Sequence, residues 1–138
     1  MLRLPTSVAA QMIGHAYDGL PDEACGLMAA RPGSDLIELF VPCRNADASS
    51  RTYSIGKDAW EAADELVYPR GLDVVGVMHS HTHTDPYPSA TDVEKGDNPL
   101  LAGWHFVIVS LRHGEPELRS YRIADGKISE DQVVPVSQ

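Results

Sequence analysis

Apolar residues recur every three or four positions in two stretches of the chain, which is the spacing of an amphipathic helix. The first stretch covers residues 5–18 and is followed by Gly19, a common residue after a helix end. The second covers residues 57–68 and is ended by Pro69, which cannot continue a helix. The periodic positions are Val8, Ala9, Met12, Ile13, Ala16 and Tyr17 in the first stretch and Trp60, Ala63, Leu66 and Val67 in the second. We therefore predict two amphipathic helices.

Shorter apolar runs bounded by Gly, Pro, Asn and Asp predict strands. Residues 72–78 are almost continuously apolar, which is typical of a strand covered on both faces of a sheet. Residues 24–30 and 35–41 are joined by the turn Arg-Pro-Gly-Ser and are expected to form a hairpin. Further strands are predicted at residues 52–55, 104–111, 117–123 and 127–134, and a short helix at 89–95. The pattern predicts an α/β fold as one domain, residues 1–138, with a central mixed sheet, flanking helices and a final meander.

Composition narrows the classes of function and partner. The formal net charge is −9, and nucleic acid and anionic membranes both require clustered Lys and Arg, so we expect neither as a partner. A partner with basic patches suits the chain better. No apolar stretch is long enough to cross a bilayer, and the start has no signal-peptide core, which predicts a cytoplasmic protein. In that reducing compartment Cys25 and Cys43 are expected to be free, buried thiols. The sequence does not distinguish a monomer from a homodimer.

The segment HSHTHTDPYPSATD, residues 79–92, concentrates potential metal ligands directly after the buried strand. Side chains alternate in a strand, so His79 and His81 point the same way if the strand continues through them. Asp92 is the candidate for a third ligand, because Ser89-Ala-Thr-Asp92 is also the pattern of a helix start with Ser89 as its cap. Two prolines stiffen the turn at residues 85–88, which could fold that helix start back onto the histidines.

This ligand set indicates a catalytic rather than a structural metal. Two His and one carboxylate leave a fourth tetrahedral position open, as in catalytic Zn²⁺ sites. A chain of 138 residues can also bury a core without a metal to hold it together. Hydrolysis of an amide further needs a group that takes and returns a proton. Glu23, between the first helix and the first strand, is one candidate, although spacing alone does not select it from the other acidic residues.

The pattern resembles the JAMM motif of the MPN(+) metalloprotease family, which has a Glu before a strand of small residues, then His-Ser-His, seven residues and Ser-x-x-Asp. Its positions are filled by Glu23, His79, Ser80, His81, Ser89 and Asp92. The likeness extends over EACGL, NADASSRTYSI, DVVGVMHSH and WHFVIVSL. It implies the cytidine-deaminase-like MPN fold, with His79, His81 and Asp92 as Zn²⁺ ligands. It also implies that Glu23 is the general acid and base and that the Ser89 hydroxyl stabilises the oxyanion.

The resemblance also implies a substrate class. Members of this family cleave bonds beside the C-terminal glycines of ubiquitin or ubiquitin-like proteins. The short chain is most similar to the bacterial, actinobacterial branch that releases cysteine from a sulfur-carrier-protein adduct, which implies a small ubiquitin-like sulfur carrier protein as substrate. The alternatives are a non-catalytic MPN-type protein-binding module and a JAMM peptidase for another peptide. Non-catalytic members lack motif ligands, so the complete motif favours an enzyme.

Neighbouring polar residues have structural interpretations. His83 continues the alternation of the ligands but is expected at the rim, because a strand would have to run on towards Pro86. Asp85 could orient a ligand imidazole, although a turn-forming role is favoured. Ser80 should point away from the ligands and support the loop. Cys25 lies close to Glu23 but is expected in the core rather than as a nucleophile. Trp104 and His105 open a strand and need no function.

Overall fold

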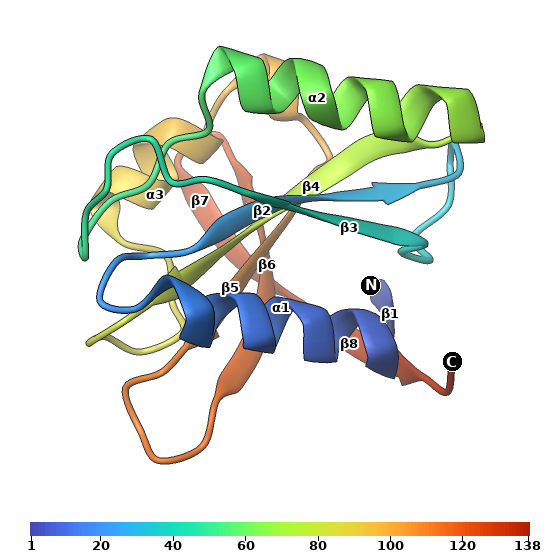
Figure 1. Ribbon diagram of the computed structural model, residues 1–138. Helices are drawn as coiled ribbons and strands as arrows, with labels where there is room; N and C mark the ends of the chain where they lie inside the picture. The colour runs from blue at the N-terminus through green and yellow to red at the C-terminus, as the bar shows by residue number, and fades with distance from the viewer.

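The computed structural model describes residues 1–138 and contains a six-stranded mixed sheet with helices against both of its faces (Figure 1). The helices are α1 (Thr6–Gly19), α2 (Lys57–Val67) and α3 (Ala90–Gly96), with short 3-10 helices at Tyr68–Arg70 and Pro99–Leu101. The strands are β1 (Leu2–Pro5), β2 (Cys25–Ala30), β3 (Leu39–Cys43), β4 (Asp73–His81), β5 (His105–Ser110), β6 (Glu117–Ala124), β7 (Lys127–Asp131) and β8 (Val133–Val136). In the order β3-β2-β4-β5-β6-β7, only β4 and β5 pair in parallel.

Alternation along the central strands divides the core into two clusters, one on each face of the sheet. Val8, Met12 and Ala16 of α1 pack against one face, and Ala63 and Val67 of α2 pack against the other. The first cluster takes Met28, Met78, Val107 and Val109 from the sheet, and the second takes Leu27, Val77, Phe106 and Ile108. The prediction that the strand at 72–78 is covered on both sides is confirmed. Further along this strand, His79 and His81 lie on the same face as Val77, which is the side of α2.

The predicted helices, the hairpin pairing of β2 with β3 and the final meander of β5, β6 and β7 are confirmed. The second strand of the hairpin begins at Leu39 rather than at residue 35, because the chain at residues 35–37 bonds to Arg3 instead. The predicted strand at 52–55 is wrong, because only an isolated bridge joins Asn45 to Ile55. The Asn45 side chain bonds the carbonyl of Thr52 and the N–H of Ser54 at 2.9 and 3.2 Å, in place of a strand ladder. No helix has the length and apolar character needed to cross a bilayer.

The predicted strand at 127–134 is two strands. The chain leaves β7 at Gln132, whose carbonyl accepts a hydrogen bond from the N–H of Leu2 at 2.7 Å. The following strand β8 then pairs in parallel with β1, and the two form a separate two-stranded sheet near both chain ends (Figure 1). No sequence pattern predicted β1, because four residues ahead of a helix carry too little alternation to indicate a strand.

Gly76 lets β4 approach β5 closely. A Cβ at this position would lie 2.5 Å from the carbonyl oxygen of His105 and 2.5 Å from Cε of Met28. Backbone cannot move aside as a side chain can, so Gly76→Ala is expected to lower the free energy of unfolding by roughly 2–3 kcal/mol. Gly14, inside α1, has no atom within 4 Å of the position that an alanine methyl would occupy, and it serves as the matched control.

Gly14→Ala should instead raise the free energy of unfolding by about 0.5–1 kcal/mol, because alanine is the better helix former. Urea denaturation of both variants checks the pair. A Gly76→Ala protein as stable as the wild type would contradict the close packing of these two strands.

Candidate metal centre

Strand β4 carries His79 and His81 to the end of the sheet on the side of α2 and α3. Both are buried, at 2% and 4% exposure, and their Nε2 atoms lie 3.1 Å apart. Parallel pairing with β5 fixes this end of β4, since His79 lies opposite Ile108 and His81 opposite Ser110. The two imidazoles therefore stand on a regular strand of the sheet rather than on a loop.

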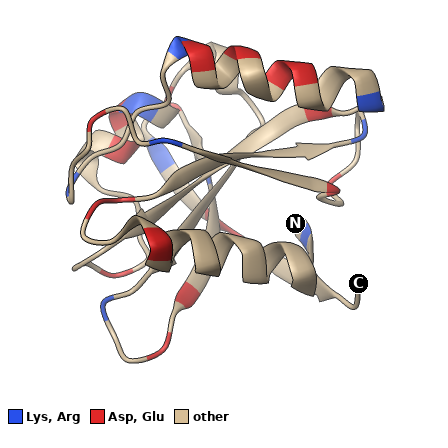
Figure 2. Cartoon of the chain, viewed as in Figure 1, with Lys and Arg blue, Asp and Glu red and all other residues tan.

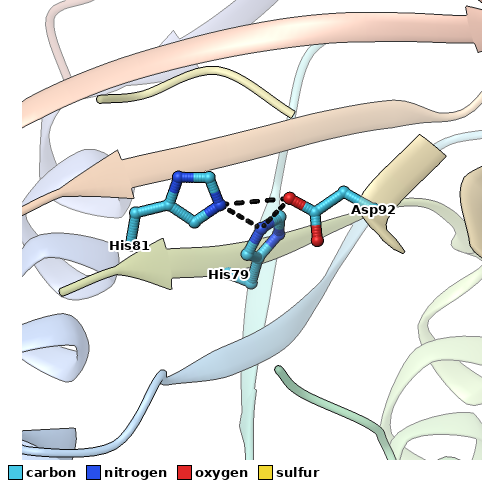
Figure 3. A group of neighbouring side chains, drawn as sticks. All are labelled: His79, His81 and Asp92. Carbon is cyan, nitrogen blue, oxygen red and sulfur yellow. Dashed lines mark hydrogen bonds and ion pairs between the residues drawn. The ribbon is translucent and has the colours of Figure 1, made fainter. Parts of the chain in front are cut away.

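Helix α3 supplies the carboxylate. Ser89 caps the helix in a capping box, in which its Oγ accepts the N–H of Asp92 at 3.1 Å and its own N–H donates to Oδ2 of Asp92 at 2.9 Å. The same Oδ2 lies 3.1 Å from Nε2 of each histidine (Figure 3). The structure therefore brings together the three predicted ligands from β4 and the start of α3.

His81 is held in the tautomer that a metal ligand requires. Its Nδ1 lies 2.8 Å from the main-chain carbonyl of Asp85, and because a carbonyl only accepts, Nδ1 carries the proton. A neutral His81 therefore points the Nε2 lone pair at His79 and Asp92. The carbonyl of Asp85 is the orienting group, while its carboxylate accepts a hydrogen bond from Arg112 at 2.9 Å. The backbone of Asp85 thus orients the imidazole of a candidate ligand as well as shaping the turn.

The spacing of the three donor atoms fits a tetrahedral metal ion. One ligand atom from each residue lies within 4.8 Å of the others, and the three separations involving Nε2 and Oδ2 are each 3.1 Å. Zinc bonds of about 2.0–2.1 Å at tetrahedral angles place neighbouring ligand atoms roughly 3.3 Å apart. The three atoms therefore form one face of such a tetrahedron, and the fourth corner has no protein ligand. This donor set fits Zn²⁺ with an open position.

Charge in the cluster favours an ionised carboxylate. Burial raises the pKa of Asp92, but its close contacts with the imidazoles of His79 and His81 outweigh burial and hold the pKa well below its usual range. Burial lowers the pKa of His79, which favours its neutral form. An ionised aspartate beside a neutral imidazole is the state in which these groups bind a divalent cation.

Glu23 lies just before β2, next to the end of β4, because the two strands are antiparallel with Cys25 opposite His79. β2 is an inner strand, so Glu23 is not aimed from a sheet edge. Its carboxylate is buried, at 5% exposure, and Oε1 has no hydrogen-bond partner. Burial raises the pKa of Glu23 to about 7, with His81 lowering it and Asp92 raising it by their charges. A carboxyl with this pKa can accept and release a proton near neutral pH.

The chain around Glu23 is fixed by hydrogen bonds to neighbouring segments. The N–H of Glu23 donates to the carbonyl of Ser49 at 2.8 Å, and the N–H of Ala24 donates to Oγ of Ser80 at 2.8 Å. The expected supporting role of Ser80 is confirmed, since it lies between the two candidate ligand histidines and points to the opposite side. The segment that carries Glu23 is therefore tied directly to the His-Ser-His tripeptide.

Two further expectations are confirmed by burial. Cys25 and Cys43 are free and buried, and burial raises the pKa of the Cys25 thiol to about 12, so the thiol stays protonated. Cys25 is thus a core residue rather than a nucleophile. His83 is exposed and lies past the end of β4, outside the ligand cluster. The alternation that would have added His83 to the ligands stops at His81.

Three residues near the site were not identified from the sequence, namely Asn45, Tyr53 and Lys95. Asn45 joins the loop to the proton-transfer candidate, because its Nδ2 donates to the carbonyl of Glu23 at 3.0 Å. Tyr53 stacks on His79 with ring centroids 4.5 Å apart and planes at 19°. Lys95 donates to the carbonyl of Tyr53. The segment NADASSRTYSI, which holds the first two, is mostly polar, and no periodic signal marks its contacts.

A central strand that ends in two histidines, with a carboxylate from the next helix beside them, is an arrangement that metal-dependent hydrolases use. The family described as prokaryotic homologs of the JAB domain matches residues 5–124, and this chain belongs to it.

Two relatives match most of the chain. The CysO-cysteine peptidase of Mycobacterium tuberculosis is 41% identical over 135 residues, covering 92% of this chain and 86% of that protein. The desampylase of Haloferax volcanii is 31% identical over 114 residues, covering 79% of this chain and 80% of that protein. The chain is therefore a JAMM-type peptidase, which agrees with the enzyme expected from its sequence.

Solved structures confirm the fold. A protein from Desulfitobacterium hafniense superposes with a TM-score of 0.89 at 27% identity, covering 100% of this chain and 94% of that one. A JAB1/MPN domain protein from Archaeoglobus fulgidus superposes with a TM-score of 0.65 at 19% identity, covering 99% of this chain and 100% of that one. The expected MPN fold is confirmed.

The raised pKa of Glu23 predicts a pH dependence of stability in metal-free protein. The folded pKa of about 7 exceeds the ordinary value of 4.5, so between these values the folded state binds more protons than the unfolded state. The contribution of Glu23 to stability is therefore greatest at low pH and is lost as the pH rises towards 7. Glu23→Gln removes the ionisable group and with it this pH dependence. At neutral pH the variant should therefore be more stable than the wild type, by no more than about 3 kcal/mol.

Urea denaturation of metal-free wild type and Glu23→Gln from about pH 5 to pH 8 measures the difference. Equal pH profiles for the two proteins would show that the Glu23 carboxyl is not perturbed.

Proposed function

We propose that this chain is a zinc-dependent peptidase that removes an amino acid, such as cysteine, from the C-terminal glycine of a small ubiquitin-like sulfur carrier protein. In this proposal His79, His81 and Asp92 hold the zinc ion. The observation that carries it is the closure of three donor atoms at 3.1 Å on one another, with His81 fixed in the metal-binding tautomer.

The proton-transfer role falls to Glu23. When bound in a site with an open position, zinc supplies Lewis-acid polarisation and makes water acidic enough to react near neutral pH. Glu23 is buried, has an unpartnered oxygen and has a pKa of about 7. These properties suit it to take a proton from the attacking water and return it to the leaving amine.

In the proposed mechanism, the Ser89 hydroxyl stabilises the oxyanion of the scissile carbonyl. Its Oγ accepts the N–H of Asp92 at 3.1 Å, which leaves the hydroxyl hydrogen free of that bond. That hydrogen is available to donate to a substrate oxygen beside the ligand set. The capping bond fixes the hydroxyl at the helix start, so the donor is held in place before the substrate arrives.

An apolar pocket on the same face of the sheet as the ligands supports a peptide substrate. It has a volume of about 180 Å³ and lies between α2 and α3. Val77, two residues before His79 on β4, and Tyr53, which stacks on His79, both line it. Its other apolar lining residues are Ile55, Trp60, Leu101, Trp104 and Phe106. The pocket offers a place for an apolar side chain of a peptide whose scissile bond lies at the ligands.

The choice of a sulfur carrier rests on the relatives and on charge. The relative from Mycobacterium tuberculosis is named for the CysO-cysteine adduct, and the sequence resembles the branch that cleaves such adducts. Acidic side chains follow one another along α2 (Figure 2), namely Asp58, Glu61, Asp64 and Glu65. This surface suits a carrier with basic residues near its tail. The name desampylase keeps a different ubiquitin-like substrate as the second candidate.

The proposed division of roles predicts that metal binding and hydrolysis separate in Glu23→Gln. Purified wild type should contain about one zinc per chain, and chelation should abolish hydrolysis until zinc is restored. Glu23→Gln should bind zinc equally but lose at least about 100-fold in rate, because glutamine cannot accept the proton. Metal analysis and a hydrolysis assay measure both properties.

Glu115→Gln, in the exposed turn between β5 and β6, is the matched control and should keep the wild-type rate. A fully active metal-free protein would refute the zinc mechanism, and a fully active Glu23→Gln protein would remove Glu23 from it.

The proposed substrate predicts a change in mass. A ubiquitin-like sulfur carrier with cysteine joined to its C-terminal glycine should lose one cysteine residue when incubated with zinc-loaded protein. Mass spectrometry of the carrier detects the loss, and the Glu23→Gln protein provides the background. An unchanged carrier, beside active cleavage of another ubiquitin-like conjugate, would replace the sulfur carrier by the second candidate.

A further inference from the structure

The two ligand histidines differ in what holds their second ring nitrogen. Nδ1 of His81 donates to the Asp85 carbonyl at 2.8 Å, whereas Nδ1 of His79 is buried without a hydrogen-bond partner. Metal-binding histidines usually gain their orientation from that second hydrogen bond. His79 therefore needs another source of orientation if its Nε2 is to stay 3.1 Å from Oδ2 of Asp92.

The Tyr53 ring stacks on the His79 imidazole, with the two ring planes nearly parallel. Their ring centroids are 4.5 Å apart with an interplanar angle of 19°, and His81 meets the same imidazole edge-on at 5.0 Å and 61°. Rotation of an imidazole about its Cβ–Cγ bond is otherwise soft. A flat neighbour at stacking distance opposes that rotation, because turning the ring drives its edge into the tyrosine face.

Tyr53 is itself fixed on both sides along the chain. The Asn45 side chain bonds the carbonyl of Thr52 at 2.9 Å and the N–H of Ser54 at 3.2 Å, the two residues that flank Tyr53. Nδ2 of Asn45 also donates to the carbonyl of Glu23 at 3.0 Å. One amide therefore places Tyr53 in register with the proton-transfer candidate.

Lys95 fixes Tyr53 from the helix that carries Asp92. Its ammonium donates to the carbonyl of Tyr53, lies 5.2 Å from the centre of the tyrosine ring and is 3.8 Å from a carboxylate oxygen of Asp47. Asp92 and Lys95 are one helical turn apart on α3. The Tyr53 ring that stacks on His79 is thus joined to α3, the helix that carries the third candidate ligand.

We propose that Tyr53 is a positioning residue of the metal centre: its ring face sets the rotation of the His79 imidazole, the task that the Asp85 carbonyl performs for His81. The inference rests on the proposed zinc function, since it assigns a ligand role to His79. It concerns the face of the ring and not the hydroxyl, because the stack is the contact that the two side chains make.

Zinc affinity tests this role without an activity assay. Tyr53→Leu and Tyr53→Met fill the space with side chains that have no flat face, and each should weaken zinc binding by roughly 10- to 100-fold, as loss of an outer partner of a ligand does. Tyr53→Phe keeps the face and should bind zinc within about threefold of the wild type. Competition with a chromogenic chelator measures the affinities, and thermal unfolding of the metal-free proteins measures folding.

Trp60→Leu is the matched control, because Trp60 lines the same pocket and packs on Trp104 at 6.0 Å rather than on His79. It should lose stability and keep the zinc affinity. Zinc binding by Tyr53→Leu or Tyr53→Met at the wild-type affinity would overturn the proposal. Weakening by Trp60→Leu equal to that by Tyr53→Leu would overturn it too, since loss of packing alone would then explain the result.

An NMR measurement on the wild type tests the proposal even if Tyr53→Leu and Tyr53→Met both unfold. In metal-free protein the ring protons of His79 should resonate upfield of those of His81, because they lie over the face of an aromatic ring. Absence of that difference would overturn the proposal. Failure of the wild type to bind zinc at all would instead refute the proposed function, so the two failures are distinguishable.

Discussion

The antiparallel pairing of β2 with β4, with Cys25 opposite His79, is the constraint on which the site depends. It brings the start of one strand to the end of the other, so that a glutamate and two histidines distant in sequence share one corner of the sheet. Ser80 reinforces the pairing from between the histidines by accepting the N–H of Ala24. The alternation of a strand thereby lets three consecutive residues serve two purposes: the outer pair faces the candidate metal centre and the middle residue holds the segment that carries the glutamate.

Helix α3 completes the site through one carboxylate oxygen that makes several contacts. The carboxylate of Asp92 closes the capping box with Ser89 and meets both imidazoles with the same oxygen. The direction of that oxygen is fixed by the helix start before any metal binds. Turn residues between β4 and α3 contribute as well, because the Asp85 carbonyl sets the tautomer of His81. Backbone groups and local capping thus orient much of the ligand set.

The sequence predicted those parts of the fold and site that arise from local periodicity or from a recognisable motif. Helical spacing indicated α1 and α2, the continuous apolar run indicated β4, and the Ser-x-x-Asp pattern indicated the start of α3. Strand alternation placed His79 and His81 on one face. Glu23 came from the family resemblance alone, since its position depends on strand pairing, which no local pattern records. The pairing of β1 with β8 joins the two ends of the chain, and Asn45 and Tyr53 act through contacts across a polar loop. Such long-range contacts leave no periodic trace in sequence.

The shared oxygen of Asp92 has a consequence for how such a protein changes over evolution. A replacement by asparagine at this position would keep an oxygen able to accept the Ser89 N–H, and so would preserve the first turn of α3, while removing the anion from the cluster. A single substitution can therefore remove the negative charge from the cluster while the fold of the helix start is kept.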